Sequence, residues 1–361
     1  MALIRKSMDI AEPISPSLEF FTRRQHENIL EFLRTASGSN FATNRSWDFW
    51  EWKHLSNPFG VSDAILARDP VTHVITGTRL AMQWQLQCPG SSALRPVRFV
   101  DTATHPDYRR RKIFSTLSLR LLETLKQRGT PFIFNTPNPT SLAGYLKLGW
   151  QLVTDWPLYF QIQNPGFFDR RKETGPKQPS GGIPRWDEIF SKEIIPARFF
   201  FESAEDDLTL FLSQTGKDRS SGAYRTPRTL GYLRWRYGQH PHVPYGISTV
   251  KTKDRLLGFA IIRPNSRHGL KEGVVTEIFL AEQNTELAHD LLGQVAQNVH
   301  ADYLVAHFNE GTLEREALLS SGYQPLRGQT VPFTVHPLNP CEPSPSAAAS
   351  WDLSMGDLEI F

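Results

Sequence analysis

The chain has 361 residues and a formal net charge of +3, which is too small to indicate a nucleic-acid-binding protein by itself. Hydrophobic residues make up 39% of it and charged residues 21%, so the chain is able to bury a sizeable core. No stretch has the roughly 18 apolar residues that cross a bilayer, and the N-terminus lacks the apolar segment of a signal peptide. We therefore expect a cytoplasmic protein of two domains, with no membrane span and no nucleic-acid partner. The two cysteines, Cys88 and Cys341, lie far apart in sequence and predict neither a disulfide framework nor a metal site.

Beyond a flexible leader at residues 1–20, helical and strand patterns alternate along the first half of the chain. Helices are predicted at 25–34, 47–55, 114–127 and 141–148. Strands are predicted at 64–67, 73–87, 97–103 and 132–134, and two more within 150–163, one on each side of Asp155-Trp156-Pro157. Antiparallel strands thus come first and a strand–helix–strand–helix–strand run comes last, which is typical of an α/β domain.

One stretch rich in Pro and Gly lies between the halves of the chain, and one rich in Pro, Ser and Ala lies near its C-terminal end. Residues 164–189 predict a linker, and residues 338–361 predict a tail whose low-complexity part ends in an apolar and acidic patch. This patch either docks on the body of the protein or remains disordered. The predicted domains are therefore 21–163 and 190–337.

Short motifs of the first half recur in the second half in the same order. The matched positions are Trp52 with Trp235, Gly77 with Gly258, Asp101 with Glu277, and Gly149 with Gly322. The spacing between partners shrinks gradually along the chain, as a few loop deletions would produce. Four matches in matching predicted contexts predict two related domains in tandem.

The turn between the strand at 97–103 and the helix at 114–127 is the most informative stretch. A strand that turns directly into a helix leaves backbone N–H groups free at the helix start, and these groups and the helix dipole favour a phosphate. Positive charge is added at the same place by Arg109, Arg110, Arg111 and Lys112. The turn therefore predicts a pyrophosphate site, while a solvated helix start or a nucleic-acid contact is the alternative interpretation.

Two motifs around this turn resemble those of the GCN5-related N-acetyltransferase (GNAT) superfamily. The family's Val-x-Pro-x-Tyr-Arg motif is matched by Pro106, Tyr108 and Arg109. Its Asn-x-x-Ala-x-x-x-Tyr-x-x-x-Gly-Phe motif is matched, with the spacing intact, by Asn138, Ser141, Tyr145, Gly149 and Trp150. The two glycines that follow the first motif in the family are Lys112 and Phe114 here, so Lys112 either contributes its own charge or weakens cofactor binding.

The resemblance covers residues 45–163 and, more weakly, 190–336. It implies an α/β fold of two tandem GNAT-like domains, each a mixed, mostly antiparallel sheet flanked by helices. It also implies an N-acyltransferase, most simply an N-acetyltransferase, that uses acetyl-CoA or another acyl-CoA and no metal. The acceptor would be a small-molecule amine, such as an amino sugar or another metabolite.

The resemblance further assigns roles to single residues. Tyr145 would protonate the leaving thiolate, and Asp101 would orient or deprotonate the amine, with His105 as a second choice. The residues implied to contact the cofactor are Thr102, Ala103, Thr104, Arg109, Arg110, Arg111, Lys112, Ile113, Phe114, Asn138, Ser141 and Tyr145. Packing alone is the competing interpretation of Tyr145, and local capping or pairing is that of Asp101.

The second half lacks the features of a phosphate site. No arginine run follows Glu277, and Glu282 and Glu286 would repel a phosphate. Leu318 stands at the position that Tyr145 has in the first half. We therefore expect the second half to complete an acceptor cleft, with inert structural packing as the alternative.

Two other functions fit a doubled fold of this kind. An aminoacyl transferase of the peptidoglycan-bridge type would share the architecture, but such enzymes lack an intact coenzyme A motif, so Asn138 and Tyr145 argue against it. A non-catalytic acyl-CoA-binding or scaffold protein is motivated by Lys112 and Phe114. Neither the acceptor, the acyl length nor the oligomeric state follows from the sequence.

Overall fold

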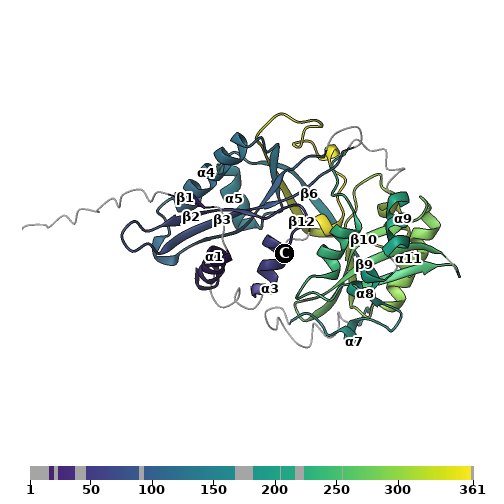
Figure 1. Ribbon diagram of the computed structural model, residues 1–361. Coiled ribbons are helices and arrows are strands. Elements are labelled where there is room, and N and C mark those ends of the chain that lie inside the picture. Colours follow the sequence, from purple (N-terminus) through teal and green to yellow (C-terminus); the bar gives the residue numbers. More distant parts are fainter. Residues whose placement is uncertain are drawn as a thin grey trace, which may run out of the picture.

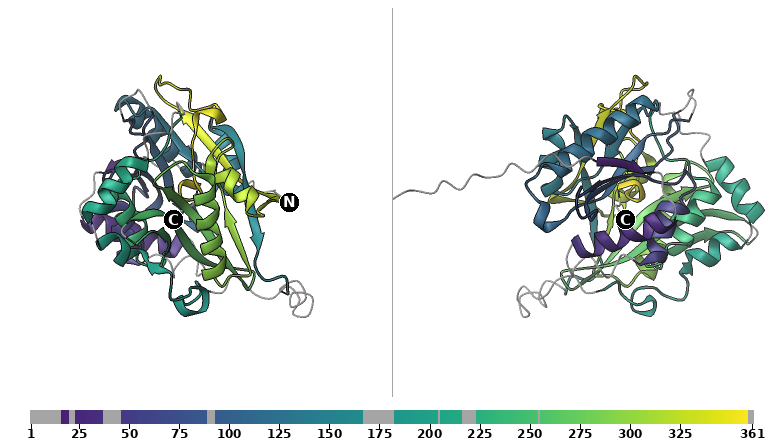
Figure 2. Two further views of the ribbon diagram at one scale, coloured as in Figure 1. Left: turned by 90° about the vertical axis from the view of Figure 1, so that its right-hand side faces the viewer. Right: turned by 60° about the vertical axis from the view of Figure 1, so that its left-hand side comes forward.

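The computed structural model describes residues 16–19, 23–36, 46–88, 93–166, 182–203, 205–215, 223–253 and 255–358. The strands of the first half are β1 (Pro16–Glu19), β2 (Asp63–Arg68), β3 (Ile75–Gln83), β4 (Val97–Thr104), β5 (Phe132–Asn135) and β6 (Gln151–Ile162). The strands of the second half are β7 (Ile195–Pro196), β8 (Gly246–Lys251), β9 (Leu256–Arg267), β10 (Leu270–Leu280), β11 (Tyr303–Ala306) and β12 (Gln324–Pro337). They form one 12-stranded sheet whose two faces are covered by helices (Figures 1 and 2).

The helices follow the same division. Those of the first half are α1 (Arg23–Ala36), α3 (Trp47–Trp50), η1 (Glu51–Leu55), η2 (Pro106–Tyr108), α4 (Ile113–Gln127) and α5 (Pro139–Lys147). Those of the second half are α7 (Trp186–Ile189), α8 (Ala197–Glu202), α9 (Glu205–Thr215), α10 (Leu230–Leu233), η3 (Arg234–Gly238), α11 (Thr285–Asn298), α12 (Leu313–Ser320), η4 (Ala348–Ser350) and α13 (Met355–Leu358). The predicted α/β class, a mixed and mostly antiparallel sheet flanked by helices, is confirmed.

One order of elements occurs in both halves. In the first half, α3 and η1 lead into β2, β3, β4, α4, β5, α5 and β6. In the second half, α10 and η3 lead into β8, β9, β10, α11, β11, α12 and β12. Both η1 and η3 are single π-helical turns that directly continue an α-helical turn.

The last strand of each half is exchanged with the other half. The sheet order is β1-β2-β3-β4-β5-β12-β6-β11-β10-β9-β8-β7, so β12 pairs with β5 and β6 pairs with β11. The two exchanged strands pair with each other at the centre of the molecule (Figure 1). The sheet is therefore continuous, and the division into domains 21–163 and 190–337 stays a prediction.

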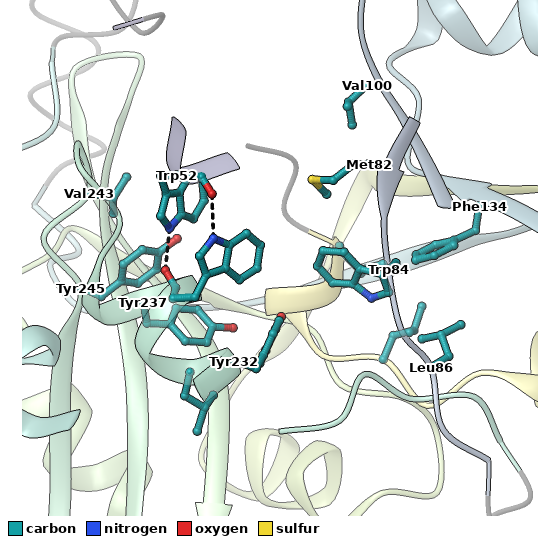
Figure 3. Close-up of a cluster of buried hydrophobic side chains, with 14 of the residues drawn as sticks. Trp52, Met82, Trp84, Leu86, Val100, Phe134, Tyr232, Tyr237, Val243 and Tyr245 are labelled. Atoms are coloured by element: carbon teal, nitrogen blue, oxygen red, sulfur yellow. Dashed lines mark hydrogen bonds between the residues drawn. The ribbon is translucent and has the colours of Figure 1, made fainter. Parts of the chain in front are cut away.

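A single large hydrophobic core joins the two halves. It lies on the sheet face that carries α1, α3 and η1 in the first half, and α8, α10 and η3 in the second. Figure 3 shows how Trp52 and Trp84 of the first half lie near Tyr232, Tyr237 and Tyr245 of the second. Two smaller cores lie on the opposite face, one beneath α4 and α5 and one beneath α11 and α12.

Two tryptophans make a reciprocal contact at the centre of this core. The indole N–H of Trp52 donates to the carbonyl of Trp235 at 2.6 Å, and the indole N–H of Trp235 donates to the carbonyl of Trp52 at 2.8 Å (Figure 3). Their rings stack with centroids 5.1 Å apart. Both tryptophans are buried and anchor the core where the two halves meet.

The structure corrects three expectations about connecting segments. Residues 16–19, expected in a flexible leader, form an edge strand on β2, whereas residues 1–15 and 20 lie outside the described residues. Residues 186–189 of the expected linker form α7, which buries Ile189 completely. The two strands expected within 150–163 are one strand, β6. Pro157 is tolerated there because the register of the partner strand β12 shifts between Pro325 and Thr330, which faces Pro157.

The tail docks on the body of the protein along its described part. Trp351, Leu353 and Leu358 bury their side chains in the large core. The guanidinium of Arg98 on β4 donates to the carbonyl of Asp357 at 2.8 Å, so the tail also reaches the sheet of the first half. The apolar patch is thus part of the core, and residues 359–361 lie outside the described residues.

Candidate functional site

Strands β4 and β5 separate after a short stretch of pairing. Their parallel ladder holds Val97 against Ile133 and Arg98 against Phe134, and no further pair. Beyond it, the side-chain amide of Asn135 donates to the carbonyl of Phe99 at 2.8 Å and closes the base of the opening. The sheet thus presents backbone groups of β4 that β5 does not use.

The opened edge of β4 contains a bulge at Asp101. This residue has a φ of 45°, which is rare for a residue other than glycine, and the register against β3 shifts between Thr78 and Leu80. Such strain in a strand often marks a functional position. The three residues predicted to meet the cofactor here, Thr102, Ala103 and Thr104, follow the bulge and are half-buried.

The basic run lies at the start of α4. Arg109, Arg110, Arg111 and Lys112 are all exposed, and α4 begins at Ile113. The first N–H groups of a helix lack partners within the helix, so this end combines backbone donors, a favourable dipole and four cations. Such an arrangement is able to hold a phosphate.

The backbone conformation at position 112 suits glycine, the residue that the family motif predicts there. Lys112 adopts a left-handed backbone conformation with a φ of 59°, which costs a side-chain-bearing residue about 1 kcal/mol or more. Helix α4 also packs tightly on β3, because a Cβ at Gly77 would lie only 2.5 Å from Cγ2 of Ile113. Phe114, at the second family glycine position, lies 6.3 Å from the ring of Tyr145.

Tyr145 on α5 lies over the base of the opening. Its ring is buried and stacks on Trp150 at a centroid distance of 4.6 Å, and its hydroxyl accepts a hydrogen bond from the amide of Asn135 at 3.3 Å. Asn138 caps α5, since its side-chain oxygen accepts from the backbone N–H of Ser141 at 2.8 Å. Tyr145 therefore lies at the opening, and Asn138 stabilises the start of α5 beside it.

Asp101 points to the other face of the sheet, where it is paired. One carboxylate oxygen, Oδ2, lies 2.6 Å from Nζ of Lys53 and 3.0 Å from Nε2 of His54. Both partners are fully buried, and Nδ1 of His54 is 2.9 Å from the hydroxyl of Ser62. The structure shows the local pairing that was one interpretation of Asp101, and its catalytic role stays a prediction. His105 caps η2 by accepting from the N–H of Asp107.

A comparison with protein families decides which superfamily this geometry belongs to. Residues 19–153 match the family described as the acetyltransferase (GNAT) domain. This range contains the opened strand, the basic helix start and Tyr145. Residues 19–153 are a GNAT domain. The predicted superfamily is thereby confirmed, whereas no curated protein matches the chain.

Solved structures share the fold over about nine tenths of the chain. A probable N-acyltransferase from Enterococcus faecalis V583 has a TM-score of 0.60 at 12% identity, over 90% of this chain and 73% of that chain. A GCN5-related N-acetyltransferase from Anabaena variabilis has a TM-score of 0.58 at 10% identity, over 90% of this chain and 73% of that chain. The N-myristoyltransferase of Saccharomyces cerevisiae, solved with bound myristoyl-CoA, has a TM-score of 0.55 at 13% identity, over 92% of this chain and 80% of that chain. Identities this low show a shared fold alone, which extends beyond the GNAT domain into the second half.

Sequence reasoning missed three kinds of residue at the GNAT site. Asn135, which closes the opening, ends a buried strand, and a polar residue at such an end was a usable signal. Lys53 and His54 directly follow the core residue Trp52, and their partner Asp101 is distant in sequence. Arg79 on β3 is completely buried beside Tyr145, and nothing in a strand pattern distinguishes it.

The second half holds a cavity of about 380 Å³ at the position that corresponds to the GNAT opening. Its walls include Glu277 and Leu280 of β10, Phe308 after β11, and Thr312 at the start of α12. Residues 225–230, α9 and the tail residues 352–354 complete it. The cavity is rich in hydroxyl and charged side chains, and its place after β10 matches residues 101–104 of the first half.

Two further observations concern classes of site. Among the residues described here, no helix has both the length and the apolar character needed to cross a membrane. Within the same ranges, no group of three or more His, Cys, Asp or Glu side chains gathers as a metal site requires.

Proposed function

We propose that the chain is an acyl-CoA-dependent N-acyltransferase, most simply an N-acetyltransferase, that acylates a small-molecule amine. One observation carries this proposal: the opened edge of β4, the basic start of α4 and the hydroxyl of Tyr145 lie at one end of one sheet. This arrangement offers an anion site, a strand edge that β5 leaves open, and an acid within one GNAT domain. We further propose that the chain is a tandem of GNAT-like halves, which the repeated order of elements supports.

Each group has a distinct task in this proposal. The start of α4, with Arg109 and Arg111, binds the pyrophosphate of coenzyme A through charge and backbone N–H groups. The backbone of residues 102–104, on the side of β4 that β5 leaves open, holds the thioester and polarises its carbonyl, as an oxyanion hole does. Tyr145 gives a proton to the sulfur that leaves.

The amine acceptor is assigned to the side of the second half. The second half has a cavity where the first has its cofactor opening, and that cavity carries hydroxyl and charged side chains but no basic helix start. Asn284 caps α11, and Glu286 lies in its first turn, so a phosphate is disfavoured there. These features disfavour a second coenzyme A, so the second half contributes to the acceptor side rather than binding a cofactor of its own.

The cofactor assignment is tested by replacing two arginines. Arg109→Ala/Arg111→Ala is expected to weaken binding of acetyl-CoA about tenfold or more, because two charge-assisted contacts to phosphate are lost. Isothermal titration calorimetry measures this change. The control is Arg120→Ala/Lys126→Ala, which removes equal charge from exposed positions further along α4. Equal affinity in the two double variants would place the pyrophosphate elsewhere.

The acid is tested by Tyr145→Phe. The variant is expected to lower kcat about 100-fold while the dissociation constant for acetyl-CoA stays nearly unchanged, since only proton transfer to sulfur is lost. Release of coenzyme A is followed with glucosamine as the first acceptor of an amine screen. Tyr323→Phe serves as control, because this buried tyrosine of the second half has no hydrogen-bond partner for its hydroxyl in the described part of the chain. Unchanged kcat in Tyr145→Phe would return Tyr145 to packing.

A further inference from the structure

Arg79 is a buried cation that forms no ion pair with a carboxylate among the residues that the structure describes; its guanidinium lies against aromatic rings instead. It stands on β3, opposite the bulge of β4, and its side chain is completely excluded from solvent. None of its three guanidinium nitrogens has a hydrogen-bond partner among the residues that the structure describes. Buried charges in proteins are ordinarily paired, since an unpaired one is strongly destabilising.

The surroundings of Arg79 lie at the proposed cofactor site. The guanidinium carbon is 4.2 Å from the ring centre of Phe99, 4.9 Å from that of Phe114 and 5.0 Å from that of Tyr145. Burial lowers the pKa of Arg79, and the neighbouring Tyr145 opposes this shift. The carboxylate of Asp101, in the bulge opposite Arg79, is held by Lys53 and His54.

The second half supplies an independent comparison. The match of Gly77 with Gly258 places Ala260 at the position of Arg79, and Leu318 stands at the position of Tyr145. The arginine and the tyrosine are therefore both absent from the half that lacks a phosphate site. Arg79 and Tyr145 thus occur together in the half that carries the proposed phosphate site, and they are in contact there.

We propose that Arg79 is the electrostatic partner of Tyr145, and that it stabilises the negative charge that leaves the acyl group with the coenzyme A sulfur. This inference rests on the proposed function and deepens it. The amine nitrogen bonds to the carbonyl carbon, the carbon–sulfur bond breaks, and its electron pair goes to sulfur. Tyr145 transfers its proton to the thiolate, and Arg79 neutralises the phenolate that remains. The surplus proton of the amide nitrogen passes to solvent, from which Tyr145 is reprotonated.

Arg79 is a positioning residue in this scheme, so its test needs a readout that packing alone does not move. We compare Arg79→Met, which keeps length but loses charge, with Arg79→Lys, which keeps charge. Arg236→Met is the control, because Arg236 is an equally buried arginine of the second half that donates to Tyr245. Calorimetry gives the affinities of acetyl-CoA, free coenzyme A and desulfo-coenzyme A at a pH where the free thiol is partly ionised.

The wild type is expected to prefer free coenzyme A over desulfo-coenzyme A by about tenfold, the size of one charge-assisted contact. Arg79→Met should lose this preference but keep its affinity for acetyl-CoA, and Arg79→Lys should retain most of it. The Tm of Arg79→Met should not fall below that of the wild type, because an unpaired buried charge is removed. Arg236→Met should lower the Tm and leave the preference intact.

Several results would overturn the inference. If Arg79→Met still prefers free coenzyme A over desulfo-coenzyme A, the role of Arg79 is structural. A large fall in the Tm of this variant without loss of the preference leads to the same conclusion. In another outcome, the wild type binds succinyl-CoA more tightly than butyryl-CoA, loses this difference in Arg79→Met, and binds free coenzyme A no more tightly than desulfo-coenzyme A. That result would show that Arg79 binds a negative charge on the acyl chain and not on the sulfur. Failure of the folded wild type to bind acetyl-CoA, free coenzyme A and desulfo-coenzyme A defeats the proposed function and this inference together. Binding with no role for Arg79 defeats the inference alone.

Discussion

Replacing Trp235 by alanine is expected to lower the free energy of unfolding by about 3–5 kcal/mol, as for other large buried aromatic residues. The indole is nearly fully buried, stacks on Trp52 and exchanges two hydrogen bonds with it. Its loss opens a cavity where the two halves meet and leaves the carbonyl of Trp52 without its indole donor. Urea unfolding followed by circular dichroism measures the change.

The matched control for this prediction is Trp47→Ala. Trp47 packs at the edge of the same core, is only partly buried, and donates to Glu51 within its own helix. Its replacement should cost clearly less. A cycle that adds Trp52→Ala to Trp235→Ala should show strong non-additivity, because both substitutions remove the same contacts. Additive losses, or equal losses for Trp47 and Trp235, would contradict a central role for the tryptophan pair.

Arg228→Met is expected to destabilise the protein by about 3–5 kcal/mol at neutral pH, because it leaves two buried carboxylates uncompensated. Nη2 of Arg228 lies 2.7 Å from Oδ2 of Asp357 and 2.8 Å from Oε1 of Glu277, and both acids are almost fully buried. This cluster ties the tail to β10 at Glu277, where the register against β9 shifts. Arg255→Met is the control, since its pair with Glu282 is exposed and contributes at most about 1 kcal/mol.

The loss in Arg228→Met should depend on pH. In the wild type, burial by itself raises the pKa of Asp357, but Arg228 holds this pKa below its ordinary value. The stabilisation that the Arg228–Asp357 pair provides is therefore lost as the pH falls. Burial raises the pKa of Glu277 despite Arg228. Without the guanidinium, both pKa values rise, and the folded state binds more protons than the unfolded state.

The free energy of unfolding of Arg228→Met should therefore increase as the pH is lowered from 8 toward 5, and its deficit relative to the wild type should shrink. Adding Glu277→Gln and Asp357→Asn to the variant should abolish this trend, because no titrating carboxylate is left in the cluster. Unfolding curves at several pH values measure it. A deficit that stays constant with pH would show that the lost stability is packing rather than charge.

Much of the fold could be predicted from local sequence. The helix at 114–127, the strand at 97–103 and the repeated tryptophans and glycines depend on periodicity and on short spacings, which a sequence displays directly. Gly77 shows why such a match is reliable, since the close packing of α4 leaves no room for a side chain there. The motif from Asn138 to Trp150 likewise placed Tyr145 at the opening of the sheet.

The missed features depend on contacts between distant residues. No periodic pattern reveals that β12 pairs with β5, that Asp101 faces Lys53 and His54, or that the tail fills the central core. Pro157 was misread for the same reason: it interrupts a strand in isolation but not opposite a shifted partner strand. Arg79 was missed because its isolation is a property of its neighbours and not of its own segment.

The exchange of β6 and β12 also determines when the protein is able to fold during its synthesis. The ribosome releases β5 long before β12, so the nascent first half waits with β5 as an unprotected edge. Its sheet closes only after residue 337 has emerged, and the GNAT domain then completes together with the second half. A messenger truncated after residue 163 would therefore yield an aggregation-prone fragment, and chaperones that shield strand edges should matter most during this interval.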